Sequence, residues 1–133
     1  MTITEAHTAL MAFYSSFGVP AFVRGNVPDG QPLPYITFDV SIGDTFGEGM
    51  LTAFNWHRWA EETGIGVAMA ERAELMDKIA EAVHPMGGIK VPCKSGFLML
   101  YRKDADFQTY YDDPTDKHII GGRTAFDVHF NVR

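Results

Sequence analysis

The chain has 133 residues, of which 46% are hydrophobic and 21% charged, and its formal net charge is -6. This composition is typical of one folded globular domain spanning residues 1–133, and it excludes an intrinsically disordered chain. The acidic balance and the lack of a basic run argue against a protein that coats nucleic acid, because such proteins neutralise phosphates with Lys and Arg.

The first residues predict neither export nor a membrane anchor. The stretch Met1–His7 lacks the positive region and apolar run of a secretory signal, and no later stretch is a long uninterrupted apolar run. The single cysteine, Cys93, has no partner for an internal disulfide. We therefore expect a protein that is made in a reducing cytoplasm and has no membrane partner.

The spacing of apolar residues predicts two helices and several strands. Helical periodicity and strict alternation distinguish the two kinds of element, and proline and glycine mark the breaks between them. The expected elements are a helix over 4–16, a short strand over 21–24, a loop over 25–34, a strand over 35–42, a glycine-rich turn over 43–49, a strand over 50–59, a helix over 68–83, strands over 89–94, 97–102 and 107–111, an acidic loop over 112–116 and a strand over 119–132. This order predicts an α+β fold, a mainly antiparallel sheet and two helices packed on one face of it.

The strand over 50–59 is unusual because both of its faces carry large side chains. These are Met50, Phe54 and Trp56 on one face, and Leu51, His57 and Trp59 on the other. A two-layer monomer covers only one of these faces, and self-association is one way to cover the second. Aromatic side chains anchor protein interfaces, so we take Trp56, Trp59, Tyr110 and Tyr111 as candidate interface residues.

The five histidines form no recognisable metal or proton-transfer site. A metal at His57 would need a ligand from another strand, such as the one that contains Asp127 and His129. Isolated strand histidines more often form a hydrogen bond or face solvent. We expect no metal, no cofactor and no catalytic residue, so that the protein is not an enzyme.

The other reactive side chains are also expected to have structural roles only. The acidic loop over 112–116 lacks the spacing of a calcium loop, and the pairs Glu61–Glu62 and Asp104/Asp106 indicate surface charge near turns. Cys93 lies next to Lys94, which could lower the pKa of the thiol, but no histidine is placed to act as its base. We expect Cys93 to be a small, half-buried residue.

The glycine-rich turn over 43–49 has no phosphate-binding spacing, and Asp44 and Glu48 would repel a phosphate. It is expected to be a hairpin tip. Asp44, Phe46 and Glu48 of this tip complete the set of candidate interface residues.

Several features together point to a known family. They are the helix Glu5–Ser16, the loop that ends in Pro34-Tyr35-Ile36-Thr37-Phe38, the returning strand of the hairpin, the central helix with Arg72, Leu75 and Ile79, and the closing strand Thr124–Val132. Their order, over most of the chain, resembles the small tail terminator (tail completion) proteins of long-tailed bacteriophages. Those proteins cap the tail tube and meet the head-side connector.

The resemblance implies an α+β fold, a homo-oligomeric ring with six subunits, and no catalysis. It also implies a virion protein of the tail or neck that is made in the host cytoplasm. Its partners would be tail tube and head–tail connector proteins, with DNA only as a cargo that passes through the lumen. A ring would cover the second face of the hairpin with neighbouring copies, and an acidic lumen would not retain the DNA phosphates. The 25–34 loop and the 43–49 tip are expected to become ordered on meeting these partners.

Three alternatives stay open. The first is another neck or tail protein, either a head–tail stopper or a tail tube subunit, although a tube subunit is expected to have a longer hairpin and more strands. The second is a small enzyme or ligand-binding domain, which would need a perturbed carboxylate or histidine pair in an enclosed apolar pocket. The third is a toxin–antitoxin or regulatory module, which would form a two-fold dimer.

Overall fold

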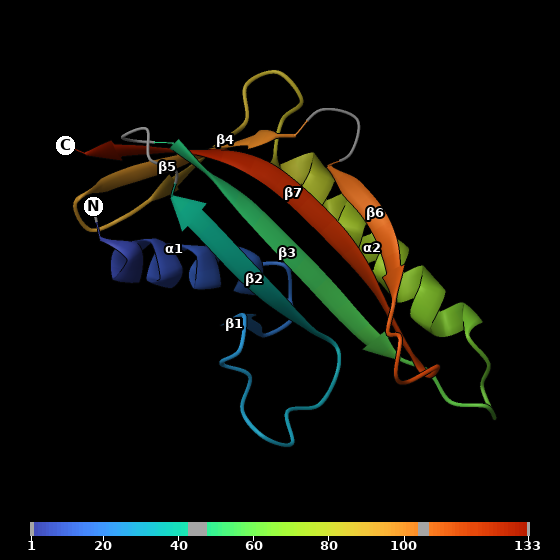
Figure 1. Ribbon diagram of the computed structural model, residues 1–133. Helices are drawn as coiled ribbons and strands as arrows, with labels where there is room; N and C mark the ends of the chain where they lie inside the picture. The colour runs from blue at the N-terminus through green and yellow to red at the C-terminus, as the bar shows by residue number, and fades with distance from the viewer. Residues whose placement is uncertain (1, 43–47, 104–106, 133) are drawn as a thin grey trace.

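The computed structural model describes residues 2–42, 48–103 and 107–132 (Figure 1). Within these ranges the chain forms two helices and seven strands. The elements are α1 (Ile3–Ser15), β1 (Ala21–Val23), β2 (Tyr35–Ile42), β3 (Glu48–Arg58), α2 (Gly66–Ala82), β4 (Ile89–Pro92), β5 (Gly96–Arg102), β6 (Gln108–Asp112) and β7 (Ile119–Val132). The expected α+β class is confirmed.

The strands form one sheet in the order β1-β2-β3-β7-β5-β4, and β6 also pairs with β7. The β1–β2 pairing is parallel and the other pairings are antiparallel, so the sheet is mixed. The expectation of a mainly antiparallel sheet therefore missed the parallel pairing at its β1 edge. The physical reason is the 24–34 loop, which brings the chain back to the start of β1 before β2 begins, and Ile36 N donates a hydrogen bond to Pro20 O there.

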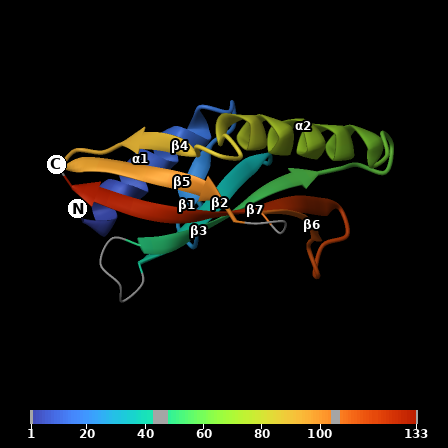
Figure 2. The same ribbon diagram turned by 90° about the horizontal axis from the view of Figure 1, so that it is seen from above.

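The closing strand β7 is the centre of the sheet. It pairs with β3 along most of its length, with β6 over its first residues and with β5 over its last (Figure 2). Three strands therefore meet at β7, and β6 lies at the opposite end of the molecule from the two termini (Figure 2). The two ends of β7 therefore pair with two different strands, β6 at its start and β5 at its end.

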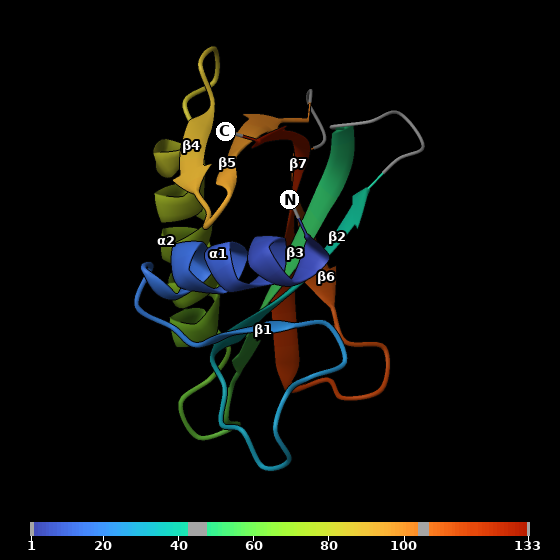
Figure 3. The same ribbon diagram turned by 90° about the vertical axis from the view of Figure 1, so that its left-hand side faces the viewer.

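Both helices contribute side chains to one buried cluster. On α1, Ala6, Leu10 and Tyr14 follow one another at four-residue spacing and are fully buried. On α2, Leu75 and Ile79 join the same cluster. Figure 3 shows α1 lying across the strand direction and α2 running roughly along it. The cluster also contains alternate residues of β2, β3, β5 and β7, namely Ile36, Phe38, Val40, Leu51, Ala53, Leu98, Leu100, Phe126 and Val128.

Candidate functional site

The alternation of β3 divides its side chains between two very different environments. Leu51, Ala53, Asn55 and His57 are buried, whereas Thr52, Phe54 and Trp56 are only partly covered and Met50 is exposed. We call the side of the sheet that carries the second set the open face. Because β3 is a central strand of the sheet, its open face is the natural place to look for a binding surface.

Three aromatic side chains meet on the open face. The ring of Trp56 is stacked on Phe54 at a centroid distance of 5.6 Å, and Tyr111 packs edge-on against both rings at 5.5 and 5.6 Å. Tyr111 belongs to β6 and the other two to β3, so β7 runs between them. These are favourable edge-on and offset arrangements. The cluster is therefore assembled by the sheet and not by neighbours in sequence.

A glycine of β7 makes room for this cluster. Gly121 is the register partner of both Trp56 and Tyr111, so it lies between the two rings. A Cβ atom at Gly121 would come within 2.9 Å of Trp56 Cε3, a distance that real Cβ contacts essentially never show. The missing side chain lets the indole lie over the β7 backbone.

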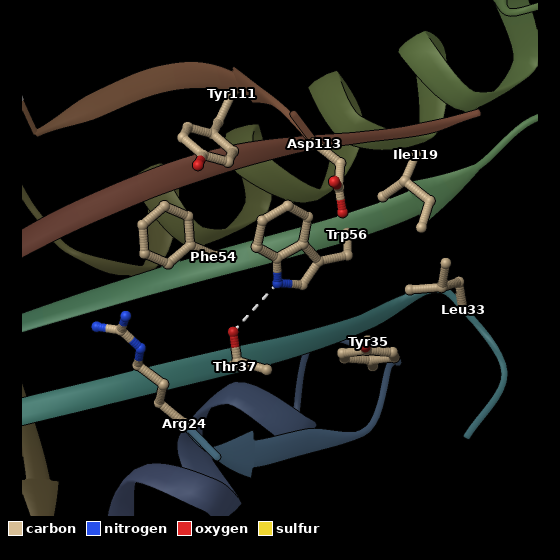
Figure 4. Close-up of a pocket in the computed structure, with 9 residues that line it drawn as sticks. All are labelled: Arg24, Leu33, Tyr35, Thr37, Phe54, Trp56, Tyr111, Asp113 and Ile119. Atoms are coloured by element: carbon tan, nitrogen blue, oxygen red, sulfur yellow. Dashed lines mark hydrogen bonds between the residues drawn. The ribbon is translucent and has the colours of Figure 1, made fainter. Parts of the chain in front are cut away.

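The aromatic cluster forms one wall of a groove of about 350 Å³. Trp56 is fixed in this wall because its Nε1 donates a hydrogen bond to Thr37 Oγ1 at 3.1 Å (Figure 4). Tyr35 stands opposite Trp56 in the β2–β3 register and packs edge-on against Phe22 of β1 at 6.0 Å. The groove is lined by Arg24, Leu33, Tyr35, Thr37, Phe54, Trp56, Tyr111, Asp113 and Ile119.

The two ends of the groove carry opposite charges. Arg24 lies at one end and Asp113 at the other (Figure 4). Asp113 Oδ1 accepts hydrogen bonds from Thr115 N and Thr115 Oγ1, both at 2.8 Å, and these bonds lower the pKa of the carboxyl group. Asp113 is therefore held in its ionised form. An apolar, aromatic centre with one cation and one anion at its ends suits a protein surface better than a reacting small molecule.

The candidate interface residues are only partly brought together. Trp56 and Tyr111 both line the groove, as Figure 4 shows. Tyr110 points to the other side of the sheet, where the Arg72 guanidinium lies 4.0 Å from its ring centroid, and 63% of its surface is exposed. Consecutive residues of a strand face opposite ways, so Tyr110 and Tyr111 cannot share one surface.

Trp59 has a different role from Trp56. It follows the end of β3, where its Nε1 donates to Lys117 O at 3.0 Å and its ring lies 4.7 Å from that of His118. His118 Nε2 is 3.0 Å from Glu61 Oε1, and Lys117 Nζ is 3.4 Å from the same oxygen. These contacts lower the pKa of Glu61. Trp59 is thus part of a contact between two segments of its own chain.

Of the remaining candidates, Glu48 is the one within the described residues. Asp44 and Phe46 fall outside the described residues. Glu48 is the first residue of β3, is exposed, and stands opposite His129 in the register with β7. It is therefore at the opposite end of β3 from Trp56.

Most of the residues that line the groove were not among the candidates predicted from the sequence. Tyr35 and Thr37 fall in the strand predicted over 35–42 but were not taken as candidates, and Phe54 was placed on the correct face but was not taken as a candidate either. The available signal was the hairpin itself, because folding 35–42 against 48–58 sets Tyr35 opposite Trp56 and Thr37 opposite Phe54. Arg24 and Asp113 come from loops, and no local pattern places them at the groove.

The register separates His57 from His129, which was considered as a second ligand for a metal site. His57 pairs with Ile120 of β7, whereas His129 pairs with Glu48, so the two histidines are at opposite ends of the β3–β7 ladder. Among the described residues, no group of three His, Cys, Asp or Glu side chains is placed to hold a metal ion. Within the same ranges, no helix is long and apolar enough to cross a membrane.

The other polar candidates are engaged within the chain. Asp116 pairs with Arg58 at 3.3 Å and accepts a hydrogen bond from His118 N at 2.9 Å. Cys93 is half-buried, as expected, and burial together with the nearby Glu5 raises the pKa of its thiol. A raised pKa is the opposite of what an activated thiolate needs.

No protein-family model matches the chain, and no curated protein matches it.

Proposed function

We propose that the protein is a structural component of a phage neck or tail, a tail terminator that forms a homo-oligomeric ring with six subunits. In this role the ring caps the tail tube and joins it to the head-side connector, with tail tube and connector proteins as partners. DNA passes through its lumen without being bound. The chain is made in the host cytoplasm and ends in the virion, and it carries out no catalysis.

The observation that carries the proposal is the aromatic open face of β3. Phe54, Trp56 and Tyr111 are held rigidly by the sheet, yet they are only partly covered by their own chain. Aromatic side chains of this kind are the usual anchors of protein interfaces. A ring buries such a surface on every copy, because its head-to-tail contacts close after a full rotation.

The arrangement of the helices supports the same proposal. We infer that α1 and α2 cover one face of the sheet and leave the open face to other subunits, since both helices join the buried cluster with Leu51 and Ala53 of β3. The opposite charges of Arg24 and Asp113 suit a heterologous contact, in which each end of the groove meets a different surface of the next copy. The net charge of -6 suits a lumen that lets DNA slide through.

The test is the absolute mass of the purified protein, measured by light scattering over a concentration series, with negative-stain images of the same samples. The proposal predicts a species near six times the chain mass of 14.8 kDa and ring-shaped particles. A compact dimer would contradict it and favour the regulatory or enzyme alternatives. A monomer at every concentration would also contradict the self-assembling ring.

A further inference from the structure

A second cavity lies beneath α2, on the side of β3 away from the aromatic groove. It has a volume of about 240 Å³ and lies between the turn that follows α1, Pro34 and α2. Its apolar walls include Phe17, Val19 and Leu75. The polar side chains in its lining, His57, Glu71, Glu74 and Lys78, are all ionisable.

The hydrogen bonds of Asn55 fix the tautomer of His57. Asn55 Nδ2 donates to Gly122 O at 3.3 Å, which orients the amide so that its Oδ1 faces His57 Nε2 at 2.8 Å. Because an amide oxygen only accepts, His57 Nε2 must carry the hydrogen. In the neutral ring Nδ1 is then a bare acceptor. Burial lowers the pKa of His57, which keeps the ring neutral at neutral pH.

The acceptor Nδ1 of His57 has no hydrogen-bond partner among the described residues, although the side chain is only 1% exposed. The nearest charged atom is Glu71 Oε2 at 3.7 Å, which is also an acceptor. Two acceptors cannot bond to each other, and an unsatisfied buried acceptor is costly. His57 Nδ1 therefore lacks a hydrogen-bond donor among the described residues, and the Glu71 carboxylate lies beside it as a second acceptor.

The cations nearby do not supply that donor. Arg72 directs its Nη1 to Gly121 O at 3.2 Å and towards Asp112 at 3.8 Å, and its buried Nε makes no hydrogen bond among the described residues, to His57 Nδ1 or to any other acceptor. Lys78 pairs with Glu74 at 3.3 Å within the cavity wall. Glu71 is 52% exposed, so its carboxylate is accessible to a group that arrives from solvent. Among the described residues, Glu71 lies against His57 and makes no ion pair with a Lys or Arg side chain.

We propose that this cavity binds a primary ammonium group, the end of a lysine side chain from a partner protein. One ammonium nitrogen carries three rotatable donors, so it can donate to His57 Nδ1 and to the Glu71 carboxylate together. The methylene stem then lies against Phe17 and Leu75. The site is separate from the aromatic groove and does not depend on the ring proposed above.

The experiment uses the ¹⁵N resonances of the His57 ring, assigned by their loss in a His57→Gln variant. The probe is n-butylammonium chloride at about pH 8, where an alkylammonium keeps its charge and histidine is neutral. Tetramethylammonium chloride at the same concentration is the matched probe, because it has the charge but no N–H donor. Before any addition, the ring is expected to show the Nε2–H tautomer.

The expected result is a saturable shift of the Nδ1 resonance with butylammonium and none with tetramethylammonium. A Glu71→Gln variant should bind butylammonium about tenfold more weakly, because one charged acceptor is lost. A Glu81→Gln variant, on an exposed position of α2 outside the cavity, should bind like the original chain. An Nδ1–H tautomer, an equal response to both probes, or an unchanged affinity in Glu71→Gln would each overturn the proposal. The His57 signal itself reports that each variant is folded.

Discussion

The two faces of β3 differ in how far the chain satisfies its own side chains. On the buried face, Leu51 and Ala53 belong to the buried cluster that also contains residues of both helices, and Asn55 bonds to Gly122 O and His57. On the open face, Trp56 forms one hydrogen bond and stacks on Phe54, but the cluster remains partly exposed. The buried face therefore determines stability, and the open face is available for binding. The predictions below separate these two roles.

The largest expected effect on stability is at Leu51. Leu51→Ala removes a fully buried side chain from the cluster shared by both helices, so it should lower the free energy of unfolding by about 2–5 kcal/mol. Urea unfolding followed by circular dichroism measures this loss. Thr52→Ala, the next residue on the open face, is the matched control and should change the free energy of unfolding by less than about 1 kcal/mol. Equal losses in the two variants would contradict the division of faces.

Trp56 should show the reverse pattern. Trp56→Ala removes the central ring of the groove, and we expect self-association to weaken by about 2 kcal/mol or more, which is at least about thirtyfold. The loss in folding stability should be smaller than that of Leu51→Ala, because the ring is only partly covered. Light scattering over a dilution series measures the association. An unchanged midpoint of dissociation would place the interface elsewhere.

The buried face should also respond to pH through His57. Burial lowers the pKa of His57 below its ordinary value of 6.5, so the folded state favours the neutral ring more than the unfolded state does. This contribution to stability is fully present above about pH 6.5 and is lost as the pH falls through the lowered pKa. Urea unfolding at pH 7.5 and at pH 5.5, both approximate settings, should show a loss in the original chain.

The control for the pH effect is His57→Gln, which keeps a donor near Asn55 Oδ1 and does not titrate. It should lose less stability between the two pH values. The carboxyl groups whose pKa is lowered, Glu5, Glu61 and Asp113, titrate below this window and affect both chains alike. Parallel losses in the two chains would show that another group carries the pH dependence.

The smallest expected effect comes from the neighbouring tyrosines of β6. Tyr110→Ala removes an exposed cation–π contact with Arg72, so it should cost about 0.5–1 kcal/mol of stability and leave self-association unchanged. Tyr111→Ala should weaken self-association, because its ring packs on Phe54 and Trp56. The two variants remove the same side chain from opposite faces. Loss of association in both would contradict the assignment of the interface to one face.

Much of the fold was predictable from local patterns. The strand predicted over 119–132 has the bounds of β7, and the stripe of Leu75 and Ile79 predicted the buried side of α2. The parallel pairing of β1 was not predictable, because three residues carry no signal of strand direction. The direction of β1 relative to β2 depends on the path of the 24–34 loop, which is set by the fold of the whole chain.

The candidate site was less predictable than the fold, because it is assembled by register. Trp56 was taken as a candidate because of its residue type. Its neighbours Tyr35 and Tyr111 come from two other strands: Tyr35 from β2, which pairs with β3, and Tyr111 from β6, which pairs with β7. No sequence pattern marks Gly121 as part of the site either, although its missing side chain allows the rings to meet. A pairing register, once known, would have identified all of these residues.

The central claim is that the open face around Trp56 is buried when the protein assembles, and acrylamide quenching of Trp56 fluorescence tests it most directly. The chain has two tryptophans, so a Trp59→Phe variant leaves Trp56 as the only reporter. The account predicts that Trp56 is shielded at high protein concentration and becomes accessible as dilution lowers the mass seen by light scattering. Equal accessibility at all concentrations, while the mass changes, would contradict it.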